Sequence, residues 1–314
     1  MSLSTEKLKL LRESISALGF DRVGFAPAAI VTDYSRYQQW LDAGFAGGMD
    51  YMHRNCCLRE DPRELLAEAR SVILVSMNYH WPIEETDSEG RGRVSRYARG
   101  RDYHKVMRKR LQKAELILRD EFGAQATRVC VDSAPLLERS LAASAGLGWI
   151  GKNTMLIDER LGSWTFLAAL LCDLDLPGDT PVSDRCGNCT ACLDACPTQA
   201  FPEPGVLDAS KCISYLTIEH KGEVDKDLAE QMGDHVFGCD ICQEVCPWNN
   251  KAPVTMIDDF RPRDQVTAPI LSDLLKLDEA GFLDRFAGTP VIRAGLEGMK
   301  RNTGIAQENT RRIK

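Results

Sequence analysis

Two patterns of apolar residues alternate along the first half of the chain. Arg22–Ala26 and Ser71–Tyr79 are apolar runs of strand length, and the second is typical of a strand buried on both faces. Asp102–Glu121 instead has helical spacing with a basic face. We also expect a helix at Leu136–Ala145 and strands at Arg128–Val131, Thr154–Ile157 and Trp164–Cys172. This alternation predicts an α/β (α+β) fold, in which helices pack on a layered sheet.

Composition marks a boundary after this half, because Leu176–Ser183 is rich in proline and glycine. We therefore expect residues 1–175 to form an α/β catalytic domain, residues 176–250 a cysteine-rich module, and residues 251–314 a C-terminal segment with a helical tail. The composition, 27% charged and 44% hydrophobic, is that of an ordinary soluble protein. Without an apolar run of about 18 residues or a signal-peptide pattern, we expect a cytoplasmic protein, and nothing requires more than a monomer.

A glycine pattern, Gly146-x-Gly148-x-x-Gly151, matches the spelling of a dinucleotide-binding fingerprint. That fingerprint follows a strand and opens a helix. Here the glycines follow an expected helix and lead towards an expected strand. The sequence therefore indicates a helix C-cap and loop, and not a nucleotide site.

Charge is unevenly distributed. The formal net charge is −7, yet between Arg91 and Lys113 there are ten Lys or Arg residues and one acid, Asp102. Local fields steer a polyanion more than the total charge does. The segment is therefore either a solvated helix face or a surface that binds a polyanion.

Eight of the twelve cysteines lie close together in the sequence. The first motif is Cys186-x-x-Cys189-x-x-Cys192-x-x-x-Cys196-Pro197, and the second is Cys239-x-x-Cys242-x-x-x-Cys246-Pro247 with Cys212 as a remote member. This is the spacing of two-cluster ferredoxins, in which the last cysteine of each run binds the other cluster. We expect a ferredoxin-like module with two [4Fe–4S] clusters, one held by Cys186, Cys189, Cys192 and Cys246, and the other by Cys196, Cys212, Cys239 and Cys242.

Two Cys₄ zinc sites are the alternative, but zinc ribbons do not need a three-cysteine loop or the Cys-Pro ending. The other four cysteines, Cys56, Cys57, Cys130 and Cys172, are expected to be small buried hydrophobic residues.

A set of longer motifs resembles one family, the epoxyqueuosine reductases. The resemblance runs from about residue 5 to about residue 306 and rests on REDP (59–62), YARGRDYH (97–104), VDSAP (131–135), GLGWIGKN (146–153), ACPTQA (195–200), KCISYLT (211–217) and GCDICQEVCPWN (238–249). By this resemblance we expect the C-terminal segment to be shortened relative to that of longer members of the family.

The resemblance implies a cobalamin enzyme with two [4Fe–4S] clusters. Such an enzyme reduces the epoxide of epoxyqueuosine, at the wobble position of a tRNA, to queuosine, the last step of queuosine biosynthesis. It takes electrons from an external donor. By this resemblance the catalytic acid is Asp132, Tyr103 and His104 are candidates for orienting the substrate, and the candidates for the cobalamin pocket are Arg59, Tyr97, Asp132, Lys152, Asn153, Ser214 and Asp240.

The proposed role of Asp132 has a chemical reason. Removing an epoxide oxygen as water takes two electrons and two protons, so a positioned acid lowers the barrier. Asp132 follows an expected strand and precedes an expected helix, a place where ligands bind in α/β folds. A helix N-terminus would lower its pKa, whereas a proton donor needs a raised one. Capping that helix is the alternative role.

Two other functions remain open: a corrinoid reductive dehalogenase of a small molecule, and a ferredoxin-type electron carrier. Under the tRNA interpretation, residues 91–113 would bind anticodon-stem phosphates, and Arg99 or Arg101 would contribute to that binding.

Overall fold

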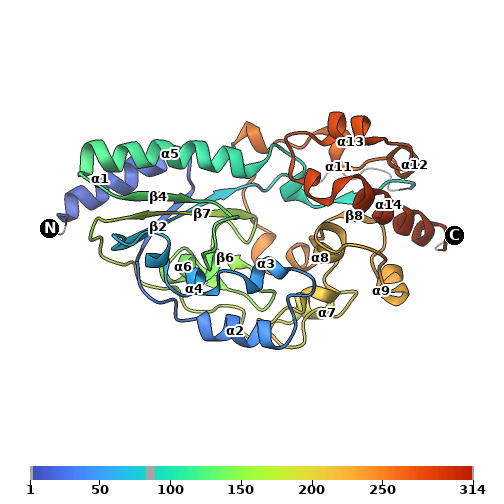
Figure 1. Cartoon of the computed structure of the whole chain (residues 1–314), viewed down its shortest axis with the longest axis horizontal. Coiled ribbons are helices and arrows are strands. Elements are labelled where there is room, and N and C mark those ends of the chain that lie inside the picture. The colour runs from blue at the N-terminus through green and yellow to red at the C-terminus, as the bar shows by residue number, and fades with distance from the viewer. Residues whose placement is uncertain (1–2, 83–88, 313–314) are drawn as a thin grey trace.

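A four-stranded antiparallel sheet forms the centre of the N-terminal half. In the computed structural model, which describes residues 3–82 and 89–312, the strands lie in the order β1 (Arg22–Pro27), β2 (Ser71–Asn78), β7 (Thr165–Cys172) and β4 (Thr127–Cys130) (Figure 1). Four of the five expected strands form this sheet and are confirmed, whereas the fifth, expected at Thr154–Ile157, is the two-residue β6 (Leu156–Ile157) outside it. Because all three pairings are antiparallel, the rule that places ligands at the carboxyl ends of parallel strands does not apply here.

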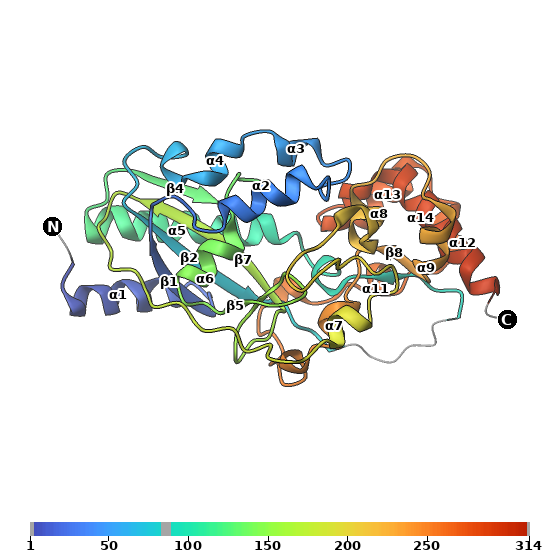
Figure 2. The same cartoon turned by 90° about the horizontal axis from the view of Figure 1, so that it is seen from below.

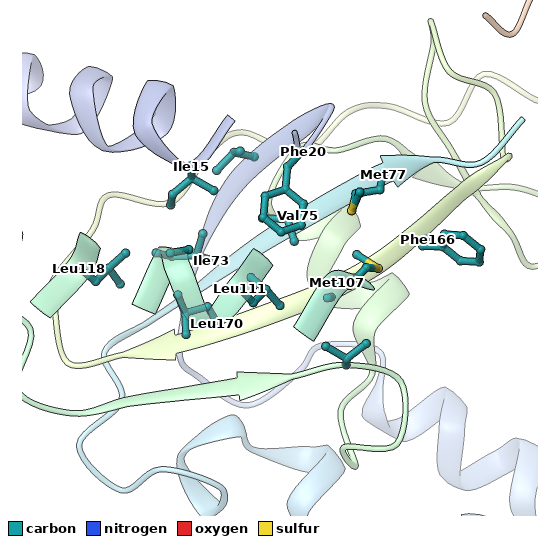
Figure 3. Close-up of a cluster of buried hydrophobic side chains, with 14 of the residues drawn as sticks. Ile15, Phe20, Ile73, Val75, Met77, Met107, Leu111, Leu118, Phe166 and Leu170 are labelled. Carbon is teal, nitrogen blue, oxygen red and sulfur yellow. The ribbon is translucent and has the colours of Figure 1, made fainter. Parts of the chain in front are cut away.

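Helices cover both faces of this sheet, which is why all eight residues of β2 are buried. Helices α1 (Thr5–Ser16) and α5 (Tyr103–Phe122) lie on one face, where Leu111 and Leu118 pack against Ile73 and Leu170 (Figure 3). The other face is covered by α6 (Glu138–Ser144), whose Leu141 belongs to a second cluster with Leu74 and Leu171. Further helices on this side are α2 (Tyr34–Asp42), α3 (Asp50–His53) and α4 (Cys56–Glu60).

The glycine pattern joins α6 to a small hairpin of β5 (Trp149–Ile150) and β6 (Leu156–Ile157). Gly146 follows the last turn of α6 with a φ of 70°, and its N–H bonds back to the carbonyl of Ala143. The glycines therefore end a helix and open a hairpin, so the interpretation as a helix cap and loop is confirmed.

A second lobe contains the cysteine motifs and lies at the far end of the molecule from the N-terminus (Figure 2). Its centre is the parallel pair β3 (Arg93–Val94) and β8 (His235–Phe237), on which α14 (Gly295–Arg312) packs. The remaining helices are α7 (Ala191–Asp194), α8 (Ile213–Ile218), α9 (Lys226–Gln231), α10 (Ile241–Glu244), α11 (Asp264–Thr267), α12 (Leu271–Leu275) and α13 (Glu279–Phe286).

The expected helical tail is thus present, and it contributes to a hydrophobic core separate from those of the sheet. That core combines Val94, Phe237, Phe282 and Met299, so it draws on all three expected parts of the sequence. Among the described residues, no helix is long and apolar enough to cross a membrane.

Candidate active site

Asp132 stands two residues after β4 in an unusual backbone conformation. Its φ is +50°, the left-handed region that non-glycine residues enter only at a cost of about 1–3 kcal/mol. The conformation is held by the Asp132 N–H, which donates to Glu138 Oε1 at 3.0 Å, and by the Ser133 N–H, which donates to the Val131 carbonyl at 2.6 Å. Helix α6 begins only at Glu138, so Asp132 does not cap it and the capping interpretation is wrong.

His104 joins Asp132 to a second carboxylate. Asp102 caps α5: its Oδ1 accepts the backbone N–H of His104 at 3.0 Å and lies 2.7 Å from Nδ1 of the same residue. The other ring nitrogen, Nε2, lies 2.9 Å from Asp132 Oδ2. Both nitrogens of the imidazole thus contact a carboxylate, and we call this hydrogen-bonded chain the row Asp102–His104–Asp132.

This row determines where its proton resides. Burial alone would lower the pKa of His104, but its hydrogen bonds to Asp102 and Asp132 and their charges raise it to about 9. Burial would raise the pKa of Asp132, but the hydrogen bond and charge of His104 outweigh it and lower that pKa. At neutral pH the site therefore contains an imidazolium beside a carboxylate, and the carboxyl is not the group that carries the proton.

Two tyrosines border the Asp132 carboxylate. Tyr103 stacks on Phe166 with ring centroids 4.2 Å apart, and its hydroxyl bonds to Asp132. Tyr97, in a short 3₁₀ turn at Arg96–Ala98, meets Tyr103 edge-on at 6.3 Å. Burial, and next the charge of Asp132, raise the pKa of both phenols, so both remain protonated at neutral pH.

Two further charged or titratable residues reach Asp132, Glu138 from α6 and Arg293 from the C-terminal segment. Burial, followed by the charge of Asp132, raises the pKa of Glu138 to about 8. Arg293, from the C-terminal segment, binds Glu219 through two bonds of 3.1 and 3.0 Å, and its positive charge helps to lower the pKa of Asp132. No sequence motif singled out either residue, and Arg293 reaches Asp132 only through the fold.

The expected cobalamin residues separate into two groups. Four border the second cysteine group. Tyr97 is close enough to Asp240 for the charge of Asp240 to raise its pKa. Asp240 is buried and accepts the Arg96 N–H at 2.7 Å, Asn153 donates to the Cys242 carbonyl at 3.2 Å, and Ser214 bonds to Cys212.

Besides Asp132, described above, two further expected cobalamin residues bond elsewhere. Lys152 donates to the carbonyls of Gly187 and Cys189 in the first cysteine motif, at 2.7 and 2.9 Å. Arg59 donates to the Arg54 carbonyl at 2.8 Å and lies over the ring of Tyr37.

The eight motif cysteines gather in the two groups expected from their spacing. Burial raises the pKa of Cys192, and the neighbouring thiols of Cys246, Cys186 and Cys189 raise it further. In the other group burial raises the pKa of Cys239, followed by the charges of Cys212 and Cys196 among its neighbours, while Cys239 and Cys212 do the same for Cys242. Cys242 also feels the charge of Cys192, so the two groups are neighbours.

No three His, Cys, Asp or Glu side chains of the described ranges converge tightly enough to hold a single metal ion. The thiolates around an iron–sulfur cubane bind four different irons and stand further apart. Of the remaining cysteines, Cys130 and Cys172 are buried in the sheet as expected. Cys57 is exposed, so the prediction that it is buried is wrong.

The basic segment is less free than its composition suggests. Arg99 is only 8% exposed and donates to the Val94 carbonyl at 2.7 Å, so its expected contact with RNA is wrong. Arg101 is exposed but pairs with Asp259 at 2.9 Å. Within residues 91–113, the exposed cations for which the structure gives no acidic partner lie on one stripe of α5: Lys105, Arg108, Lys109 and Lys113.

Comparison with known proteins identifies both parts of this site. The family model "Epoxyqueuosine reductase QueG, DUF1730" matches residues 59–133, and the model "4Fe-4S double cluster binding domain" matches residues 185–249. An epoxyqueuosine reductase of Xanthomonas campestris pv. campestris is 44% identical over 310 residues, covering 97% of this chain and 87% of the relative. One of Cellulophaga algicola is 39% identical and covers 96% of this chain and 98% of the relative.

Two solved structures share the whole fold. A crystal structure of an epoxyqueuosine reductase with a tRNA-Tyr stem loop modified with epoxyqueuosine matches with a TM-score of 0.92 and 30% identity, covering 97% of this chain and 82% of that one. An epoxyqueuosine reductase from Bacillus subtilis, with its catalytic aspartate loop swung out of the active site, matches with a TM-score of 0.90, 29% identity and the same coverage.

Proposed function

Because this chain belongs to the epoxyqueuosine reductase family and is therefore an oxidoreductase, we propose that it reduces the epoxide of epoxyqueuosine in tRNA to the alkene of queuosine. The observation that carries this proposal is the position of Tyr97. The charges of Asp132 and of Asp240, which is next to Cys239 in the sequence, both act on its hydroxyl and, after burial, raise its pKa. The proton-holding residues and the cluster module thus meet at one place, as a reaction that consumes electrons and protons requires.

The reaction balances with two electrons and two protons. Both carbon–oxygen bonds of the epoxide break, an alkene forms, and the oxygen leaves as water. The electrons come from an external donor through two [4Fe–4S] clusters, held by the two groups of four cysteines. The Lys152 ammonium on the carbonyls of Gly187 and Cys189 fixes the loop of the first cluster.

The residues near Tyr97 and the second cysteine group have a chemistry that suits cobalamin. The buried hydroxyl of Ser95 has no hydrogen-bond partner among the described residues and lies against Gly238, next to Tyr97. Such a group suits the amide side chains of a corrin. Tyr97, Asn153, Ser214 and Asp240 would hold the cofactor, with Asp132 facing it. When bound, cobalamin supplies a low-valent cobalt that acts as a strong reductant and nucleophile towards the strained ring.

Asp132 protonates the oxygen as it leaves. General acid catalysis of this kind contributes about 10²–10⁴-fold in rate. The Bacillus subtilis relative supports this role, because an aspartate loop described as catalytic is swung out of the active site in its structure. In this chain the side chain of Glu138 holds the backbone of Asp132.

The basic stripe of α5 binds the RNA backbone. Its lysines line a groove of about 390 Å³ together with Arg101 and Arg110. The groove begins at the α5 turn that carries His104, so phosphates bound there would place a splayed base near Asp132. The relative solved with a tRNA stem loop supports this partner, and a tRNA substrate agrees with a cytoplasmic enzyme.

The test is an anaerobic preparation of the whole chain, reconstituted with iron, sulfide and cobalamin and assayed on tRNA that carries epoxyqueuosine. We expect iron–sulfur absorption, corrinoid bands and formation of queuosine. The D132N variant should keep both cofactors and lose about 10²-fold or more in turnover. A protein that binds no corrinoid would be a ferredoxin-type carrier, and one that reduces halogenated aromatics but not the tRNA would be a dehalogenase; either result refutes the proposal.

A further inference from the structure

The site has a proton donor that lacks its proton. The carboxylate of Asp132 is ionised beside His104, whereas the reaction needs an acid at that position. The neighbouring imidazole is held on the line to Asp132 Oδ2 at 2.9 Å, and its other nitrogen is fixed 2.7 Å from Asp102. A carboxylate only accepts hydrogen bonds, so Asp102 keeps Nδ1 protonated and directs Nε2 at Asp132.

We propose that His104 is the proton reservoir of this active site and that Asp132 is the relay through which its Nε2 proton reaches the substrate oxygen. The inference rests on the proposed function. As negative charge develops on the oxygen, the Nε2 proton first passes to the ionised carboxylate at Asp132 Oδ2. The protonated Asp132 then passes this proton to the oxygen. The products are neutral His104, ionised Asp132 and a hydroxyl group. No electron moves in this step.

The same relay serves the second proton. The His104 side chain is 34% exposed, so the neutral imidazole takes up a proton from water between the two transfers. The second pass protonates the hydroxyl, which leaves as water. Asp102 stays ionised throughout, since the hydrogen bond from His104, against the opposing effect of burial, lowers its pKa.

The surroundings keep the imidazole charged and oriented. The ring of Tyr103 stacks on it with centroids 4.1 Å apart, and Tyr103 also bonds to Asp132. Glu138 is the remaining acid that feels His104, and its raised pKa keeps it largely neutral at pH 7. From other elements, the charge of Arg293 acts on Asp132, and the charge of Asp132 in turn acts on Tyr97, Tyr51 and Arg139.

The experiment compares pH profiles of H104Q and wild type, because glutamine keeps an amide near the position of Nε2 but carries no mobile proton. For wild type we expect kcat to fall as pH rises through about 9, where His104 loses its proton. In H104Q we expect kcat at pH 7 to drop at least tenfold, with KM for the tRNA unchanged. The pH above which kcat falls should also move from about 9 to below 6 in this variant. D102N, which can still cap α5, should likewise lower the pH at which kcat falls.

A second readout does not depend on turnover. In the ¹⁵N-histidine spectrum of the holoenzyme, the resonance missing from H104Q should titrate near pH 9, and D132N should lower that value. His80, whose pKa burial lowers and whose ring lies at the carbonyls of Ala252 and Pro253, gives the matched control: H80Q should leave the pH profile unchanged.

The outcomes separate this inference from the proposed function. If the enzyme converts the tRNA but H104Q has the wild-type kcat and pH profile, the relay is refuted and the proposed function stands. A His104 resonance that titrates below pH 7 overturns the relay even if H104Q fails to fold. If the holoenzyme converts no epoxyqueuosine at all while His104 titrates near 9, the proposed function fails instead.

Discussion

Replacing Asn302 by alanine should loosen the attachment of the C-terminal helix to the second cluster. Asn302 is fully buried on α14, and its Nδ2 donates to the carbonyls of Thr217 in α8 and Val236 in β8, at 2.8 and 2.9 Å. Thr217 in turn accepts the Gly238 N–H through its Oγ1 at 2.8 Å, directly before Cys239. One amide therefore ties three segments together at a cluster ligand.

The expected loss in the free energy of unfolding follows from the two backbone carbonyls that N302A leaves buried without the Asn302 donor. Each such loss costs about 1–3 kcal/mol, and the second lone pair of a carbonyl keeps the loss in the lower part of this range. We expect about 2–4 kcal/mol in total, which for a chain of this size corresponds to a melting temperature lower by about 5–10 °C. The Cys239 loop should also hold its cluster less well.

The assay is thermal unfolding followed by circular dichroism, with iron and sulfide content measured on the same samples. Asn309 provides a matched control, because it also sits on α14 and donates to two carbonyls, those of Ala229 and Gly233 at 2.8 and 3.0 Å, but these belong to the α9 region and not to the cysteine loop. N309A should lower the melting temperature and keep all its iron. A melting temperature of N302A within 2 °C of wild type, or equal iron loss in both variants, would refute the reasoning.

Three further variants test separate parts of the structure. L111A removes a fully buried side chain between α5 and the sheet and should cost about 2–5 kcal/mol in a denaturation curve; a loss below 1 kcal/mol would contradict the packing in Figure 3. G148A would place a Cβ 2.1 Å from the Ile157 carbonyl, so the hairpin must shift and the melting temperature should fall; an unchanged value would refute this. R99Q should lower stability without changing the salt dependence of tRNA binding. K109Q should leave stability unchanged and make tRNA binding less dependent on salt. A reduced salt dependence in R99Q alone would show that Arg99 contacts the RNA after all.

The strands and α5 were predictable because their signals are local: an apolar run for β2, and helical spacing with a basic face for α5. The antiparallel order was not predictable. A strand covered on both faces has the same apolar sequence whether its neighbours run parallel or antiparallel. Here α1 and α5 on one side and α6 on the other make β2 fully buried within an antiparallel sheet.

The site was predictable where a motif carries the chemistry. The cysteine spacing identified the cluster module, and the motif around Asp132 led to the acid. The bond from His104 to Asp132 spans 28 residues, and the approach of Arg293 comes from the other lobe, so no spacing rule reveals either. Arg99 shows the opposite error, because a count of charges does not reveal that one of them is buried against its own backbone.

A single segment of twelve residues connects the cluster side of the site to its proton side. From β3, Arg93 and Ser95 donate to the carbonyls of Asp234 and Phe237 at 2.8 Å each, and the Arg96 N–H donates to Asp240 beside Cys239. The segment then presents Tyr97 and ends at the row of Asp102 and His104. Its path is fixed at both ends by hydrogen bonds, so a displacement of the Cys239 loop must be transmitted to the α5 cap. Loss of the second cluster should therefore alter the titration of His104 as well as electron flow, which a detachable ferredoxin module would not do.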